Sequence, residues 1–525
     1  MNTDVILVWG SNPQEAHPII YNWMRRGVKA GAQLVLIDPR RLPIANAAKY
    51  WLPVQPGTDI ALANAMAHVI IEEKLYNREF IENSTRDFDD FAREVRRYTP
   101  ESVEQLTGVD ASHIRAVARL YAQAPRAMIS WTLGITEHHN GADNVHALIN
   151  LALLTGHVGK PGCGLMPLRG QNNVQGGADM GALPDKLPGY GQVESPADRE
   201  RVEKAWNCTI QPKNGLTLSR MFDAMHMGEM QFVYIIGENP VQSDANSTAV
   251  EKALKSVHTL VVQEMFLTKT AELADVVLPA AGWSEVEGTY TNSQRGVQRV
   301  RKVANPPGEA KDDIFIFQEL ANRLGFDWNY ESAQDVWDEL RQLSPMHRGM
   351  TYERLDREGQ LQWPCVDVDQ PSTLRLHTDL HDQPGQRLVP FVFVEYDTPA
   401  EPVNDEFPFV LITGRRLPFY NTGVTTSDYG PTVKGQSEYL EMNEVDMEQL
   451  GIHDGDTASV SSKRGTLSVE VRASAKMQRG HVFMSFHFPD QVNPNLLTSD
   501  TTDKKSGVAP YKYTAVKISA LSMSR

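Results

Sequence analysis

The chain has 525 residues, of which 41% are hydrophobic and 22% charged, and its mean hydropathy is -0.38. This length is too great for one hydrophobic core and the composition excludes a disordered chain, so we expect a globular protein of about two to four domains. The formal net charge of -15 argues against direct binding to nucleic acid or to an anionic membrane, since both require basic surface. No apolar run approaches the roughly 18 residues of a transmembrane helix, which favours a soluble enzyme.

The three cysteines, Cys163, Cys208 and Cys365, are far apart in the sequence and form no CxxC pair. This spacing excludes a self-contained iron-sulfur or zinc site of recognisable pattern. We expect each thiol to be buried, as free cysteines commonly are. The scarcity of cysteine is typical of a reducing compartment, and the beginning of the chain reads as a strand rather than as a secretory signal, so we expect a cytoplasmic protein.

The beginning of the chain predicts a strand, a helix and a second strand. Residues 5–9 are apolar and precede the turn Gly10-Ser11-Asn12-Pro13, which leads into a helical pattern as far as Lys29. Residues 34–37 are again apolar and precede Asp38-Pro39-Arg40. This order is typical of a βαβ unit. Apolar spacing predicts further helices at 60–71 and 113–122 and a strand at 128–131, so roughly the first 170 residues should form a nucleotide-type α/β domain.

A second copy of this pattern is expected further along the chain. A strand at 232–236 precedes Gly237-Glu238-Asn239-Pro240, a helix should begin at Thr248, and a strand follows at 259–263. Ligands dock at such turns at the carboxyl ends of strands in α/β sheets. The two similar units therefore predict paired nucleotide-binding halves.

From Asp405 onward, the sequence consists mainly of short runs rich in valine, threonine and serine. Strands are predicted at 409–413, 457–461 and 466–471, with turns between them, which is typical of a β-barrel. Residues 331–386, rich in proline, aspartate and arginine, are predicted to mark a domain boundary.

Arg169 stands in a run of amides and glycines, Pro167-Leu168-Arg169-Gly170-Gln171-Asn172-Asn173-Val174-Gln175-Gly176. Its guanidinium is always charged and presents a planar fork of donors that suits a carboxylate. Glycines allow the backbone to approach a ligand closely. The run therefore predicts an anion site, and the alternative is an ordinary polar surface loop.

Several blocks of the sequence resemble one family. These blocks are Gly134-Ile135-Thr136-Glu137-His138, Leu153-Leu154-Thr155-Gly156, Gly159-Lys160-Pro161-Gly162, the Arg169 run, and Asp179-Met180-Gly181-Ala182-Leu183-Pro184. They resemble the catalytic (alpha) subunit of molybdopterin-dependent formate dehydrogenases, in the DMSO reductase superfamily. The beginning of the chain and Tyr511-Lys512-Tyr513 near its end resemble the same family, so the similarity covers essentially the whole chain.

The resemblance implies an α/β fold with two Rossmann-like pterin dinucleotide-binding domains, at 1–171 and 172–390, followed by a C-terminal β-barrel domain at 400–525. It implies a bis-molybdopterin guanine dinucleotide cofactor with molybdenum or tungsten, formate as substrate, and electron-transfer subunits as partners. It also implies an N-terminal segment with a [4Fe-4S] cluster and a cysteine or selenocysteine metal ligand. That segment would precede Met1, on this polypeptide or on a separate chain, and a selenocysteine codon read as a stop would account for the split.

The chemistry of the residues suggests where such a cofactor binds. Asp38 and Asp59 suit purine amino groups or ribose hydroxyls, the turns at Gly10, Asn12 and Gly237 suit phosphate, and Arg40 could neutralise phosphate. By resemblance, cofactor contact extends to Gly57, Gly134, Thr136, Glu137, Gln171, Glu238, Asn239, Ser243, Gln263, Thr413, Gly414, Arg415, Asn421, Asn495, Tyr511 and Lys512.

Arg169 is the predicted catalytic residue, which would hold formate beside the metal, and no metal ligand is predicted within the chain. His138 and His139 are interpreted as structural or surface residues. The resemblance is broken at 424–427, where Val-Thr-Thr-Ser replaces a Met-Thr-Arg run more common in relatives, just after the doubled charge of Arg415-Arg416. Two alternatives stay open: another molybdopterin oxidoreductase such as a nitrate reductase, and a non-catalytic protein that binds the bis-pterin cofactor.

Overall fold

The computed structural model describes residues 2–417, 419–424, 426 and 436–521. The chain forms two compact units, each assembled from separate stretches of sequence. Unit 1 comprises Met1–Leu168, Pro240–Val250 and Arg375–Arg525, and unit 2 comprises Arg169–Asn239 and Glu251–Leu374.

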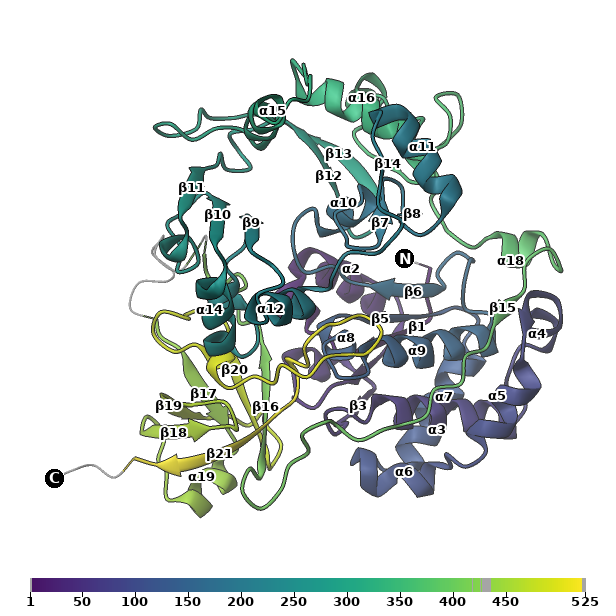
Figure 1. Cartoon of the computed structure of the whole chain (residues 1–525). Coiled ribbons are helices and arrows are strands. Elements are labelled where there is room, and N and C mark those ends of the chain that lie inside the picture. Colours follow the sequence, from purple (N-terminus) through teal and green to yellow (C-terminus); the bar gives the residue numbers. More distant parts are fainter. Residues whose placement is uncertain (1, 418, 425, 427–435, 522–525) are drawn as a thin grey trace. The chain divides into compact units, whose positions relative to one another are not determined.

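Unit 1 contains a five-stranded parallel sheet with β1 at its centre (Figure 1). The order is β3-β2-β1-β5-β6, with β1 at Val5–Trp9, β2 at Gln33–Ile37, β3 at Tyr50–Leu52, β5 at Ala127–Trp131 and β6 at Gly164–Pro167. The chain moves outward from β1 through β2 to β3, then crosses back to β5 on the other side of β1. The carboxyl ends of β1 and β5 therefore form a topological switch point, where α/β sheets bind ligands.

Both faces of this sheet are buried, as a parallel sheet requires. Alternate residues of β1 enter different cores: Leu7 and Trp9 pack into one cluster, and Ile6 and Val8 into the other. The helices and 3-10 turn of the first segment are α1 (Pro13–Ala16), α2 (Pro18–Lys29), η1 (Pro43–Ala47), α3 (Asp59–Glu72), α4 (Arg78–Ser84), α5 (Phe88–Val95), α6 (Pro100–Thr107), α7 (Ala111–Gln123), α8 (Leu133–Thr136) and α9 (Gly141–Thr155). Helices α3, α7 and α9 contribute most of the larger core, and α2 contributes Met24 to the other, so β1 lies between helices on both sides.

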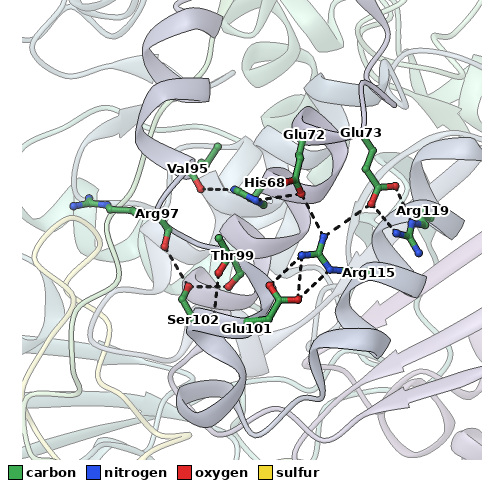
Figure 2. A network of polar contacts seen from close by, with 10 residues as sticks. All are labelled: His68, Glu72, Glu73, Val95, Arg97, Thr99, Glu101, Ser102, Arg115 and Arg119. Atoms are coloured by element: carbon green, nitrogen blue, oxygen red, sulfur yellow. Dashed lines mark hydrogen bonds and ion pairs between the residues drawn. The ribbon is translucent and has the colours of Figure 1, made fainter.

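Ion pairs join three helices of unit 1 at its surface, as Figure 2 shows. Arg115 of α7 lies 3.0 Å from Glu101 of α6 and 3.3 Å from Glu72 of α3. Arg119, one turn further along α7, lies 2.8 Å from Glu73. Charge networks of this kind stabilise more than isolated surface pairs do, so they reinforce the packing of these helices beneath the sheet.

The last segment of unit 1 closes into a six-stranded barrel in the order β16-β20-β17-β19-β18-β21. Its strands are β16 (Phe409–Gly414), β17 (Tyr439–Met442), β18 (Thr457–Ser461), β19 (Thr466–Ala473), β20 (His481–Ser485) and β21 (Thr514–Ala520), with α19 at Glu444–Leu450 and η4 at Pro494–Leu496. Val460, Val469 and Val482 are among the buried residues that fill it. Short elements complete unit 1: β4 (Thr85–Arg86), α13 (Pro240–Ser243), α18 (Asp379–Asp382) and β15 (Val389–Pro390).

Unit 2 contains a three-stranded parallel sheet, β11-β10-β9, and a three-stranded antiparallel sheet, β12-β13-β14. The strands are β9 (Phe232–Ile236), β10 (Thr259–Glu264), β11 (Val276–Pro279), β12 (Gly288–Thr291), β13 (Gly296–Val300) and β14 (Leu361–Gln362), with the hairpin β7 (Lys186–Leu187) and β8 (Gly191–Gln192). The helices and 3-10 turns are α10 (Val174–Asp179), α11 (Pro196–Trp206), α12 (Leu218–His226), η2 (Ala271–Leu273), α15 (Asp313–Arg323), α16 (Ala333–Leu343), η3 (Pro345–His347) and α17 (Tyr352–Glu358), and α14 (Ser247–Ser256) passes from unit 1 into unit 2.

The α/β class and the C-terminal barrel are confirmed, and the strands predicted at 5–9, 232–236 and 457–461 occupy those same residues. The helical stretch predicted as far as Lys29 does end at that residue, but it is interrupted at His17, because Pro18 lacks an amide hydrogen and starts a new helix. Residues 331–386, predicted to mark a domain boundary, contain α16, η3, α17, β14 and α18, and the change of unit falls after Leu374. In the described part of the chain, no helix is long and apolar enough to cross a membrane.

The expectation of three buried thiols holds for Cys365 only. Cys163 is partly exposed, and Cys208 is exposed just after Asn207, whose left-handed backbone ends helix α11.

Candidate functional site

Unit 1 contains a cavity of about 150 Å³ at the carboxyl ends of its central strands. The turns that follow β1, β2 and β5 form one side of the cavity. The other side comes from the barrel, through the end of β16 and Phe483 of β20, and from Lys512. The cavity thus lies at the switch point of the parallel sheet, where backbone amide groups are directed toward a ligand.

Two glycines meet at this switch point. Gly134 N donates to Gly10 O at 3.1 Å, and Gly10 N donates to Ile37 O at 2.9 Å. A Cβ built on Gly134 would lie 2.4 Å from Gly10 O, and Gly10 itself has a φ of +54°, which favours glycine. The absence of side chains at these positions leaves a cavity wall made of backbone.

Asp38 and Asp59 are buried acids in the wall of the cavity. Burial raises the pKa of Asp38 to about 7 and that of Asp59 to about 6, because the charged form loses hydration. Asp38 accepts a hydrogen bond from Arg40 N at 2.9 Å, and Asp59 accepts one from the Trp9 indole at 2.7 Å. Each carboxyl is therefore held in one orientation while it borders the cavity.

Three cationic side chains, Arg40, Arg415 and Lys512, line the same cavity. The Arg40 guanidinium lies 3.4 Å from the centre of the Phe483 ring and 3.2 Å from Glu441. Lys512 Nζ lies 2.9 Å from a carboxylate oxygen of Glu137. The cations and acids together suit a ligand that carries both phosphate groups and hydrogen-bond donors.

Several buried polar atoms of the cavity wall lack a hydrogen-bond partner within the described part of the protein. They are Ser11 Oγ, both amide atoms of Asn12, Glu15 Oε2, Arg40 Nε and His138 Nδ1. Buried polar groups are almost always paired in folded proteins, because an unpaired one costs about 1–3 kcal/mol. This set therefore fits a bound ligand rich in both donors and acceptors, as a pterin dinucleotide is.

The cavity brings together ten of the residues predicted for cofactor contact. They are Gly10, Asn12, Asp38, Arg40, Asp59, Gly134, Thr413, Gly414, Arg415 and Lys512. Three others adjoin it: Glu137 through its ion pair with Lys512, Gly57 next to Pro56, and Thr136 at the end of α8. Residues about 500 positions apart thus meet in one place.

Other predicted residues lie outside this cavity. Gly237, Glu238 and Asn239 follow β9 in unit 2, and Gln171 is exposed there. Asn239, Gln263 and Asn495 are buried and hydrogen-bonded to Thr270, Tyr234 and Thr498 respectively. Ser243 donates to Asp244 and Tyr511 Oη accepts from Ala245 N, both within unit 1. Asn421 is described with a φ of +45°, whereas Thr425 and Ser427 of the divergent stretch fall outside the described residues.

Sequence reasoning missed several residues of the cavity wall. His138, interpreted as structural or surface, is buried there, with Nε2 3.0 Å from Gly134 O, and burial lowers its pKa to about 4. His139 instead lies 3.1 Å from Asp397. Ser11 lies in the turn that follows the first predicted strand, so the sequence did contain a signal for it. Phe483 has no such local signal, because only closure of the barrel brings it to the cavity.

Arg169 belongs to unit 2, at the start of the loop before α10. Its side chain is exposed, and its Nε donates to Gln175 Oε1 at 2.9 Å. Its backbone N donates to Ser293 Oγ at 3.3 Å. In the described residues, no cluster of three or more histidine, cysteine or acidic side chains is suited to a metal ion.

Two models of known protein families match long stretches of the chain. Residues 1–323 match the model of the family described as molybdopterin oxidoreductase, and residues 409–515 match that of the "Molydopterin dinucleotide binding domain". The chain belongs to the molybdopterin oxidoreductase family.

Individual relatives are similar over nearly the whole chain. The F420-dependent formate dehydrogenase subunit alpha of Methanocaldococcus jannaschii is 44% identical over 98% of this chain and 76% of the relative. Formate dehydrogenase H of Escherichia coli is 39% identical over 100% of this chain and 74% of the relative. Among solved structures, acetylene hydratase from Pelobacter acetylenicus covers 98% of this chain and 78% of its own, with a TM-score of 0.76 and 20% identity, which shows a shared fold.

Proposed function

We propose that the chain is the catalytic subunit of a formate dehydrogenase. The observation that carries this proposal is sequence identity of 39% and 44% to formate dehydrogenases over at least 98% of the chain. The cavity of unit 1 supports it, because its unpaired polar atoms fit a large polar cofactor. The sheet of unit 1 and the β9–β11 sheet of unit 2 each carry a turn of the Gly-x-Asn-Pro type, so we assign one Rossmann-like half, and one guanine dinucleotide, to each.

The residues of the cavity suit distinct parts of a dinucleotide. Asp38 and Asp59 accept hydrogen bonds from purine or ribose, Arg40 and Lys512 neutralise phosphate, and the backbone of Gly10 and Gly134 allows close approach. When bound, the cofactor's molybdenum or tungsten ion supplies the redox chemistry by accepting two electrons. In this proposal the cavity of unit 1 therefore retains one of the two dinucleotides.

Formate oxidation breaks one C–H bond and yields carbon dioxide, one proton and two electrons. Arg169 contributes a fixed positive charge that binds the carboxylate through two parallel hydrogen bonds and so orients the C–H bond. The guanidinium cannot lose a proton near neutral pH, so it acts by binding and orientation, and the proton leaves by another route.

A further segment, on this polypeptide or on a separate chain, completes the enzyme in this proposal. Helix α15 buries only Ala321 among its described residues, whereas Phe315 is 47% and Leu324 is 69% exposed. Phe232 of β9 and Val276 of β11 are also exposed in unit 2. Exposed apolar surface of this kind marks a binding face, and its occupant would be the segment with the [4Fe-4S] cluster and the cysteine or selenocysteine metal ligand. Electrons would pass through that cluster to partner subunits.

The test is formate binding and oxidation by the metal-loaded complex with Arg169→Ala. Loss of a bidentate charged contact should weaken formate binding by about a hundred-fold, while metal and pterin content stay at the wild-type level. Arg199→Ala is the matched control: Arg199 lies in α11 of the same unit and donates to Val193 O. Formate binding unchanged in R169A would overturn the assignment of Arg169. A loaded complex that binds pterin yet stays redox-silent would favour the non-catalytic alternative.

A further inference from the structure

The side chain of Gln175 links Arg169 to a buried acid in unit 2. Its Oε1 accepts from Arg169 Nε at 2.9 Å, and its Nε2 donates to Asp179 Oδ1 at 2.7 Å and to Tyr190 Oη at 2.9 Å. A guanidinium only donates and a carboxylate only accepts, so these neighbours allow only one orientation of the amide. Gln175 is 6% exposed, which protects these hydrogen bonds from competition with water.

The local fold places the amide between its two partners. Gln175 and Asp179 are four residues apart in α10 and therefore lie on one face of the helix. The start of α10 is fixed by Asn173, whose side-chain oxygen accepts from Thr291 N of β12 at 3.0 Å. This contact with β12 fixes the start of α10 and therefore the position of Gln175 on the helix.

The carboxylate of Asp179, which accepts from Gln175, is itself held in place by its neighbours. It is fully buried, and its Oδ2 accepts from the Trp363 indole at 2.7 Å. His347 Nε2 lies 3.9 Å from the same oxygen, and His347 Nδ1 lies 2.7 Å from Ser344 Oγ. Burial lowers the pKa of His347 to about 4, so the imidazole is neutral near pH 7 and does not neutralise the acid.

We propose that Gln175 is a positioning residue for formate capture: it orients the Arg169 guanidinium and transmits to it the fixed position of Asp179. This inference rests on the proposed function of Arg169. A neutral amide at Nε fixes the plane of the guanidinium without placing a second carboxylate in contact with it. A carboxylate at that place would compete with formate for the same charge.

The test is a double-mutant cycle in the metal-loaded complex, with Gln175→Leu, Arg169→Ala and the two combined. Formate affinity is measured by titration calorimetry, and KM and kcat with a dye acceptor. Q175L should weaken formate binding and raise KM by about ten-fold, with a smaller change in kcat, since orientation of the bound anion is lost. In the R169A background Q175L should have no further effect, because Gln175 acts through Arg169.

A purely structural role of Gln175 predicts a different pattern. Q175L would then reduce formate affinity by the same factor with or without Arg169, or leave it within two-fold of wild type, and either result overturns the inference. Gln175→Met, which keeps the length of the side chain, is judged by the same criterion if Q175L fails to load the metal. Gln334→Leu is the control, since Gln334 is exposed on α16 of the same unit, donates to Asp338 Oδ2 and should leave formate affinity unchanged. An unchanged affinity in R169A alone would instead identify failure of the proposed function.

Discussion

At the scale of single residues, the buried acids Asp38 and Asp59 reduce the stability of the cofactor-free chain at neutral pH. Their pKa values in the folded chain, about 7 and about 6, lie above the ordinary value of 3.8. Between about pH 4 and pH 7 the folded chain therefore binds more protons than the unfolded chain. Its free energy of unfolding falls as the pH rises through this range. This loss of stability is absent below pH 4 and fully present above pH 7, and the proposed hydrogen bonds of the two acids to the cofactor would offset it in the loaded protein.

Asp38→Asn should accordingly stabilise the cofactor-free chain. At pH 8 its free energy of unfolding should rise by on the order of 2 kcal/mol, and the fall of stability between pH 4 and pH 7 should become shallower. The same variant should retain less pterin when loaded. Thermal unfolding at pH 5 and pH 8 measures the first effect, with the exposed Asp89→Asn as control. A D38N chain no more stable than wild type at pH 8 would refute this account of the buried acid.

At the scale of elements, the contact between the turns after β1 and β5 defines the shape of the cavity. Gly10 and Gly134 approach so closely that neither turn could carry a side chain at this point without moving. A shift of either turn would displace the backbone amides and Asp38 together. The cofactor site should therefore be more sensitive to this contact than the sheet itself.

Gly134→Ala should destabilise unit 1 by about 3 kcal/mol, through overpacking against Gly10, and should abolish retention of pterin. Gly27→Ala is the matched control in α2 of the same domain, where a new Cβ would lie 3.7 Å from Ile6 and meet only ordinary contact. That variant should stay within about 1 kcal/mol of wild type. Equal melting temperatures and equal pterin content for the two variants would show that the close approach is unimportant.

Strong local patterns made some elements predictable. The strands at 5–9 and 232–236 are uninterrupted apolar runs, and Asp38, Arg40 and Asn12 could be inferred because they follow such strands. Barrel closure and the assembly of unit 1 from three stretches depend on contacts between distant residues, which no local pattern encodes. For this reason Phe483 was not foreseen as part of the cavity. His138 lies only four residues after Gly134 and was interpreted as structural or surface from its residue type alone.

At the scale of the whole molecule, the two units differ in how completely they bury apolar side chains. The sheet of unit 1 is buried on both faces, whereas α15 and the outer strands of unit 2 keep large apolar side chains exposed. Parallel sheets are normally covered on both faces. Unit 2 is therefore the part of the molecule expected to depend most on a partner polypeptide.

The proposed roles of Arg169 and Gln175 both depend on the oxidation of formate by this protein. The most direct measurement is turnover of ¹³C-labelled formate by the metal-loaded complex, with carbon dioxide and reduced dye quantified together and nitrate tested as an alternative substrate. We predict one carbon dioxide for each pair of electrons transferred, loss of this activity in R169A, and no nitrate reduction. A fully loaded complex that reduces nitrate but leaves formate unchanged would contradict the account.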